Sequence, residues 1–124
     1  QIYDAYSFVN DLIKLAKSEI VLIDNYIDDT VFTLFSKYPN INFTIYTSTI
    51  SKQLKLDFEK YSKQYKNISL KTFKSSHDRF LIIDKKEIYH LGASLKDLGK
   101  KWFAFSKMSL NSLNLDDILH KLEV

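Results

Sequence analysis

The sequence predicts a single α/β domain, with a mixed, largely parallel sheet and helices on both faces. Two features of its 124 residues lead to this prediction. Short apolar runs rich in β-branched residues alternate with segments whose apolar residues recur at helical spacing. The order helix, strand, helix, strand, helix, strand up to residue 73 also requires crossover connections, which join parallel strands.

The first elements follow from apolar spacing and helix caps. Residues 3–17 have apolar positions at helical spacing and predict an amphipathic helix, and EIVLID at 19–24 predicts a buried strand. Polar residues at 28–30 predict the start of a second helix, with apolar residues at 31–35 behind them. The YPN segment at 38–40 ends that helix, because proline disfavours helical conformation in the residue before it.

A strand, a helix and another strand are expected next. INFTIYTS at 41–48 and ISLKTF at 68–73 alternate as strands do. Ser51 is expected to cap the helix between them. That helix has the clearest apolar stripe in the chain, formed by Ile50, Leu54, Phe58, Tyr61 and Tyr65.

The C-terminal part predicts a hairpin, a strand and a helix. FLIID at 80–84, the turn KKE and IYHLGA at 88–93 form the expected hairpin, whose first strand is apolar on both sides and therefore central. WFAFSKM at 102–108 predicts a further strand, and Asn114 is expected to cap a last helix.

The composition narrows the classes of protein. With 45% hydrophobic and 15% aromatic residues, the chain can form one core and is not of the disordered type. It has no cysteine, which excludes disulfides and fits a cytoplasmic location. No apolar stretch approaches the roughly 20 residues that cross a bilayer, so we expect no membrane partner. Because the chain begins with Gln1, we expect a fragment of a longer protein.

The charge is compatible with nucleic acid without requiring it. The formal net charge is +3. The lysines of the third predicted helix either follow a phosphate backbone or form an ordinary solvated face. These are Lys52, Lys55, Lys60, Lys63 and Lys66.

The segment SSHDRFLIID at 75–84 contains the most informative polar residues. His77 and Arg79, the only arginine of the chain, stand two apart before an apolar run that Asp84 closes, and GAS follows at 92–94. This pattern, H-x-R-x4-D with a small-residue turn, resembles the phospholipase D superfamily, whose motif is H-x-K-x4-D followed by G-S-x-N. The similarity is greatest to its single-motif, nuclease-like bacterial members.

The resemblance implies a metal-independent phosphodiesterase acting on nucleic acid, DNA in preference, without a cofactor. His77 would form a covalent phosphohistidine, Arg79 would hold the phosphate, and Asp84 would complete the catalytic set. Ser94 and Lys96 would bind substrate. Since one chain carries one motif, the second histidine would come from another copy, which implies a homodimer with one site at its two-fold interface.

The same residues leave room for other interpretations. Arg79 stands where the superfamily has lysine and Lys96 where it has asparagine, and a wide guanidinium fork does not replace a compact ammonium. The alternative is therefore a catalytically weak or inactive module of this kind, for nucleic-acid binding or dimerisation in a regulatory or defence protein. A purely structural oligomerisation domain is a third interpretation.

Strand geometry separates the motif residues into two groups. His77 and Arg79 share one face of a strand and are placed to meet one phosphate. Asp84, seven positions beyond His77, faces the other side, so we interpret it as an orienting or structural group at the strand end. Ser94 also fits a helix cap, and Lys96 fits an ordinary solvated lysine.

Overall fold

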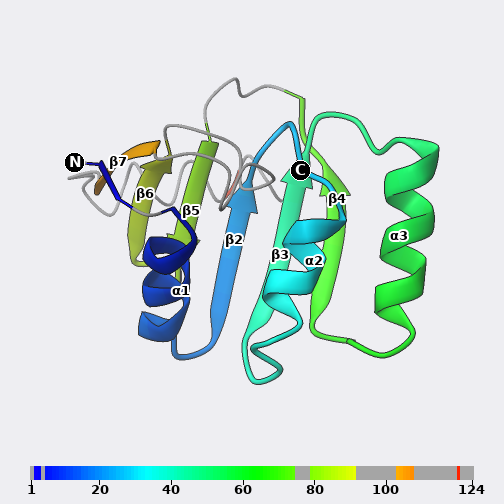
Figure 1. The fold of residues 1–124 in the computed structure, drawn as a ribbon, viewed down its shortest axis with the longest axis horizontal. Helices are drawn as coiled ribbons and strands as arrows, with labels where there is room; N and C mark the ends of the chain where they lie inside the picture. Colours follow the sequence, from blue (N-terminus) through cyan, green and yellow to red (C-terminus); the bar gives the residue numbers. More distant parts are fainter. Residues whose placement is uncertain (1, 4, 75–78, 92–102, 108–119, 121–124) are drawn as a thin grey trace.

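The chain folds into one mixed sheet with helices, which confirms the predicted α/β class (Figure 1). The computed structural model describes residues 2–3, 5–74, 79–91, 103–107 and 120. The described elements are β1 (Ile2–Tyr3), α1 (Ala5–Leu15), β2 (Glu19–Ile23), α2 (Asp29–Phe35), β3 (Asn42–Thr47), α3 (Lys52–Ser62), β4 (Ile68–Thr72), β5 (Arg79–Ile83), β6 (Glu87–Leu91) and β7 (Phe103–Lys107).

The seven strands of the described sheet lie in the order β1-β7-β6-β5-β2-β3-β4. Strands β2, β3 and β4 are parallel, as the crossover helices predict. The pairings of β2 with β5, β5 with β6, β6 with β7 and β7 with β1 are antiparallel. Parallel pairing is therefore confined to the β4 end of the described sheet, and β5 has the predicted central place.

The three described helices pack on one face of the sheet. Apolar residues of α1, α2 and α3 share a single core cluster with alternate residues of the strands, among them Ile20 and Leu22 of β2. Residues that point to the opposite face, such as Ile23 and Ile82, are also buried. The helix expected from Asn114 lies outside the described residues, apart from His120, which is helical and exposed.

Local chemistry accounts for the helix starts. Asp28 caps α2, because its carboxylate accepts a hydrogen bond from the Thr30 backbone N–H. The Ser51 hydroxyl caps α3 in the same way and accepts from the Leu54 N–H at 3.1 Å. Both caps stand where the sequence predicts them. The predicted apolar stripe of α3 also faces the core, with Leu54 buried and Phe58 packed against it.

The hairpin between β5 and β6 closes through a left-handed turn. Asp84 and Lys85 have φ angles of 52° and 57°, and the Lys86 N–H donates to the Ile83 carbonyl at 2.9 Å. These two consecutive residues with positive φ belong to the loop of residues 84–86, which joins the paired residues Ile83 and Glu87. Glycine and asparagine are the usual residues there, so this turn carries backbone strain.

Candidate nucleic-acid interface

Arg79 begins β5 and lies beside the carboxyl end of β2. The antiparallel register places Ile23 opposite Phe80, so Asp24 and Arg79 are the next facing pair. Arg79 Nε is 3.7 Å from Asp24 Oδ1. The Asp24 side chain is fully buried, whereas that of Arg79 is 26% exposed. A buried carboxylate without a counter-charge strongly destabilises the folded state. Arg79 supplies the positive charge that compensates Asp24.

Tyr26 completes this arrangement on the loop after β2. Its ring centroid is 5.6 Å from the guanidinium carbon of Arg79, within the range of a cation–π contact. The Tyr26 N–H donates to Asp24 Oδ1 at 3.1 Å. The guanidinium therefore has an ion-pair and an aromatic neighbour inside the protein, while its buried Nε makes no hydrogen bond within the described residues. The sequence did not single out Asp24 or Tyr26; the signal was an acidic residue closing the apolar run EIVLI.

Asp84 lies at the opposite end of β5, about 16 Å from Arg79 at the usual rise of a strand. Its two carboxylate oxygens accept hydrogen bonds from the backbone N–H groups of Lys17, Ser18 and Glu19 and from the Ser18 hydroxyl, at 2.9–3.0 Å. The bond from the Glu19 N–H, followed by that from Lys17, lowers the pKa of Asp84 far below its ordinary value. Asp84 therefore ties the β5–β6 turn to the α1–β2 loop.

The other predicted site residues lie outside the described residues. These are His77, Ser94 and Lys96. Their proposed roles stay predictions, and the structure does not bring Arg79 and Asp84 together. In the described part of the chain, no group of three histidine, cysteine, aspartate or glutamate side chains is placed to hold a metal ion.

One edge of the molecule collects positive charge. We call it the lysine edge and define it as residues 51–74, which contain α3 and the outermost described strand, β4 (Figure 1). All of its lysines are exposed: Lys52, Lys55, Lys60, Lys63, Lys66, Lys71 and Lys74. Only Asp57 and Glu59 oppose them, so the lysine edge has a formal charge of +5 against +3 for the whole chain.

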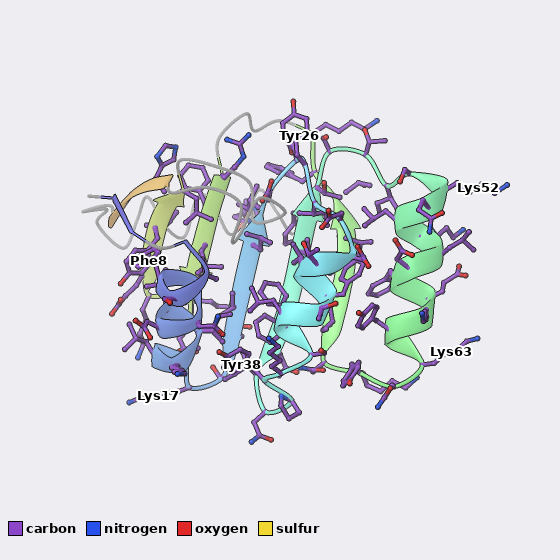
Figure 2. The ribbon with its side chains drawn as sticks, viewed as in Figure 1. Phe8, Lys17, Tyr26, Tyr38, Lys52 and Lys63 are labelled. Carbon is purple, nitrogen blue, oxygen red and sulfur yellow. The ribbon has the colours of Figure 1, made fainter. Side chains whose placement is uncertain are left out.

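The exposed face of α3 follows from its buried stripe. Leu54 and Tyr61 turn towards the core, so Lys52 and Lys63 lie on the opposite side, and Figure 2 shows both directed away from the sheet. Lys63 lies eleven positions after Lys52, which is about 16 Å along a helix. One strand of duplex DNA presents about five phosphates over that length.

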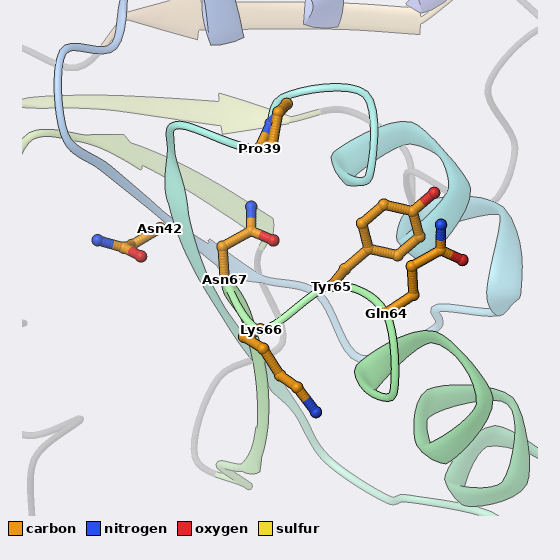
Figure 3. Close-up of a pocket in the computed structure, with 6 residues that line it drawn as sticks. All are labelled: Pro39, Asn42, Gln64, Tyr65, Lys66 and Asn67. Carbon is orange, nitrogen blue, oxygen red and sulfur yellow. The ribbon is translucent and has the colours of Figure 1, made fainter.

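A shallow depression lies where α3 ends and the chain turns towards β4 (Figure 3). It has a volume of about 420 Å³. A second hollow of about 200 Å³ shares Gln64 and Tyr65 with it and adds Lys60 and Tyr61. The first hollow is lined by Pro39, Asn42, Gln64, Tyr65, Lys66 and Asn67.

Comparisons with known proteins give a similarity of fold. No protein-family model matches the chain, and no curated protein matches its sequence. A solved structure, described as that of TrmBL2, "an archaeal chromatin protein" with "a novel mode of DNA binding", aligns with a TM-score of 0.62 and 14% sequence identity. The alignment covers 99% of this chain and 50% of the TrmBL2 chain, so the chain spans about half of that protein's length.

This comparison corrects the resemblance to the phospholipase D superfamily, which is wrong. The structural similarity leads instead to a chromatin protein, and no family model supports the motif. The described motif positions have structural explanations, because Arg79 neutralises Asp24 and Asp84 accepts hydrogen bonds from the α1–β2 loop. The H-x-R-x4-D spacing is explained by polar residues that stand at both ends of the buried strand β5. The histidine-nucleophile scheme rested on that resemblance and loses its support, while the role of His77, outside the described residues, stays an untested prediction.

The described helices can also be compared with the length and apolar character of a membrane span. None of the described helices has both the length and the apolar character needed to cross a bilayer.

Proposed function

We propose that this chain is a non-catalytic DNA-binding module of a larger regulatory protein, and that it contacts the phosphate backbone through the lysine edge. The observation that carries the proposal is the set of seven exposed lysines on α3, β4 and their flanking residues. Since the lysine edge holds more positive charge than the whole chain, the remaining residues have a net negative formal charge. The molecule is therefore polarised, and an anionic polymer meets attraction mainly at this edge.

Lysine contacts with phosphate predict a particular kind of binding. Each contact releases condensed counterions, so the affinity falls steeply with salt concentration. Phosphate contacts also carry no direct sequence information, so the module is expected to bind many sequences with similar affinity. The similarity to half of a chromatin protein described as binding DNA supports the class of partner. The choice of surface rests on the lysines alone.

The test compares two pairs of substitutions that remove the same charge. Lys52→Gln with Lys63→Gln removes two lysines from the lysine edge, and Lys14→Gln with Lys86→Gln removes two exposed lysines elsewhere. Binding to a short labelled duplex is followed by fluorescence anisotropy between about 50 and 200 mM salt, where phosphate-dependent binding changes strongly.

The two pairs are expected to behave differently. The lysine-edge pair should lower the slope of log K against log salt by up to roughly 2, since each lost phosphate contact contributes about 0.9. The control pair should leave the slope unchanged. Equal effects of the two pairs, or no binding to duplex or single strands at the lowest salt concentration, would contradict the proposal.

Self-association stays a separate prediction. The homodimer was required by the two-histidine scheme, and the reason for it disappears with the corrected resemblance. Sedimentation equilibrium over a wide range of protein concentration measures it directly. A single monomeric mass throughout that range would exclude the dimer and leave the lysine edge unaffected.

A further inference from the structure

The two hollows at the end of α3 lie inside the lysine edge and combine aromatic and cationic side chains. Tyr65 lines both of them, and Lys60 and Lys66 belong to one hollow each. We propose that the hollows hold an unpaired nucleobase against Tyr65, so that the lysine edge prefers single-stranded DNA to duplex. This inference rests on the proposed function and adds the form of nucleic acid that the surface selects.

The tyrosine is held in a fixed aromatic arrangement. The Tyr61 and Tyr65 rings stack, with centroids 6.2 Å apart and an angle of 29° between their planes. Tyr61 is itself anchored by the Phe32 ring, 5.8 Å away, and by a hydrogen bond between its hydroxyl and that of Thr33. Because its neighbour is fixed, Tyr65 loses little conformational freedom when a base stacks on it.

The size and polarity of the hollows suit a nucleotide. The larger hollow is shallow, with a volume of about 420 Å³, so a ligand there would stay partly exposed to solvent. The Asn67 Nδ2 group donates to the carbonyls of Tyr38 and Ile41, at 3.2 and 2.7 Å. Those two hydrogen bonds fix the orientation of the Asn67 amide, and its Oδ1 can accept a hydrogen bond from a ligand. The Gln64 side-chain amide can both donate and accept. These groups match the edge of a base.

The lysines complete the arrangement. Lys60 and Lys66 are exposed and belong to the hollows that Tyr65 lines, and Figure 3 shows the Lys66 side chain extending from the rim of the larger hollow, away from the Tyr65 ring. Ammonium groups beside a stacked base are placed to meet the phosphates on either side of it. A paired base inside a duplex has no free face for the tyrosine, so the preference for single strands follows from the stacking.

The experiment compares single-stranded and duplex DNA of equal length in the anisotropy assay. Tyr65→Leu removes the ring and keeps apolar bulk, and Tyr65→Phe, which keeps the ring, is the matched control. We expect Tyr65→Leu to weaken single-strand binding about fivefold to a hundredfold, with duplex binding and the salt slope unchanged. Tyr65→Phe should bind like the unchanged protein.

Photochemical crosslinking gives a second test that does not depend on the folding of a variant. A single strand containing 5-iodouracil is irradiated with the unchanged protein, and the crosslinked peptide is identified by mass spectrometry. The proposal expects Tyr65 among the crosslinked residues. Crosslinks confined to other segments, or equal effects of Tyr65→Leu on single strand and duplex, would overturn it.

The two proposals fail in different ways. If the lysine-edge pair lowers the salt slope and Tyr65→Leu changes nothing, the lysine edge binds DNA and the stacking site is wrong. If the lysine-edge pair changes neither single-strand nor duplex binding, both proposals are wrong.

Discussion

Asp24 determines the structural role of Arg79. It is fully buried and faces Arg79 across β2 and β5. Arg79→Met keeps apolar bulk but leaves the buried carboxylate without its guanidinium, which is expected to lower the free energy of unfolding by about 3 kcal/mol. Urea unfolding followed by circular dichroism measures the change.

A double substitution tests the cause. Asp24→Asn combined with Arg79→Met removes both charges, and its loss should be smaller than the sum of the two single losses. Additive losses would mean that the pair at 3.7 Å contributes little and that Arg79 acts through packing alone.

Asp84 predicts a dependence of stability on pH. Hydrogen bonds from backbone N–H groups lower its pKa in the folded protein below the ordinary value of 3.8. The folded state therefore holds the carboxylate more strongly than the unfolded state does, and this stabilisation is complete above about pH 5. It is lost progressively as the pH falls below that value towards the lowered pKa.

Asp84→Asn removes the carboxylate while keeping a residue that tolerates positive φ. We expect a loss of about 1–2 kcal/mol at neutral pH, since the bonds are charge-assisted but open to solvent. The difference from the unchanged protein should shrink between pH 5 and pH 2, as measured by urea unfolding. Asp11→Asn, at an exposed aspartate of α1, is the control. A constant difference across that range would contradict the assignment.

These two residues also show what a sequence leaves open at this scale. The strand-end position of Asp84 was predictable from the apolar run before it. Its partners, however, are backbone groups 65 to 67 residues away, and no pattern in the sequence marks a backbone N–H as a donor. Arg79 stood out as the only arginine, but its pairing with Asp24 depends on the antiparallel register of β2 and β5.

At the scale of elements, the β5–β6 turn makes the sharpest prediction. Lys85 has a φ angle of 57°, which costs a residue with a side chain about 1 kcal/mol or more relative to glycine. Lys85→Gly should therefore raise the free energy of unfolding by about 0.5–1 kcal/mol, after the greater freedom of glycine in the unfolded chain is subtracted. Its contact with Glu19, at 3.7 Å and exposed, is a weak opposing contribution.

The neighbouring lysine provides the matched control. Lys86 does not share the positive φ of Asp84 and Lys85, so Lys86→Gly should lower stability by a similar amount. Thermal unfolding of the two variants separates strain relief from loss of charge. Equal shifts in the same direction would show that the turn is not strained at Lys85.

Most elements were predictable because their signals are local. Apolar spacing and side-chain caps act within a few residues, so α3 and its Ser51 cap appeared where expected. The pairing of β1 with β7 was not predicted, because β1 has only two residues and takes its place from a partner about 100 positions away. The predicted share of parallel strands was also too high, since sheet order depends on long-range pairing.

For the whole molecule, the distribution of charge matters more than its total. The net charge of +3 suggested only mild basicity, whereas the fold gathers +5 on α3, β4 and their flanks. The helix lysines were visible in the sequence, but their union with Lys71 and Lys74 depends on β4 forming the outermost described strand beside α3. Neither the helical spacing of the α3 lysines nor the alternation of residues in β4 shows that the two elements lie together at one edge.

This uneven distribution of charge also predicts a substitution that strengthens DNA binding. Glu59 is exposed on α3, four residues from both Lys55 and Lys63, and opposes the lysine edge. Glu59→Lys should strengthen duplex binding at low salt and increase the salt slope by up to about 1, through one additional phosphate contact. It should cost α3 only a few tenths of a kcal/mol in like-charge repulsion.

Asp11→Lys is the matched control, because it changes the net charge by the same amount at an exposed position of α1. If net charge alone governed association, both variants would strengthen binding equally. If the lysine edge is the contact surface, Asp11→Lys should leave the salt slope unchanged, since a charge beyond the Debye length of about 8 Å is largely screened at physiological salt. Anisotropy titrations of the two variants on one duplex thus distinguish a molecule that binds by total charge from one that binds by its α3–β4 edge.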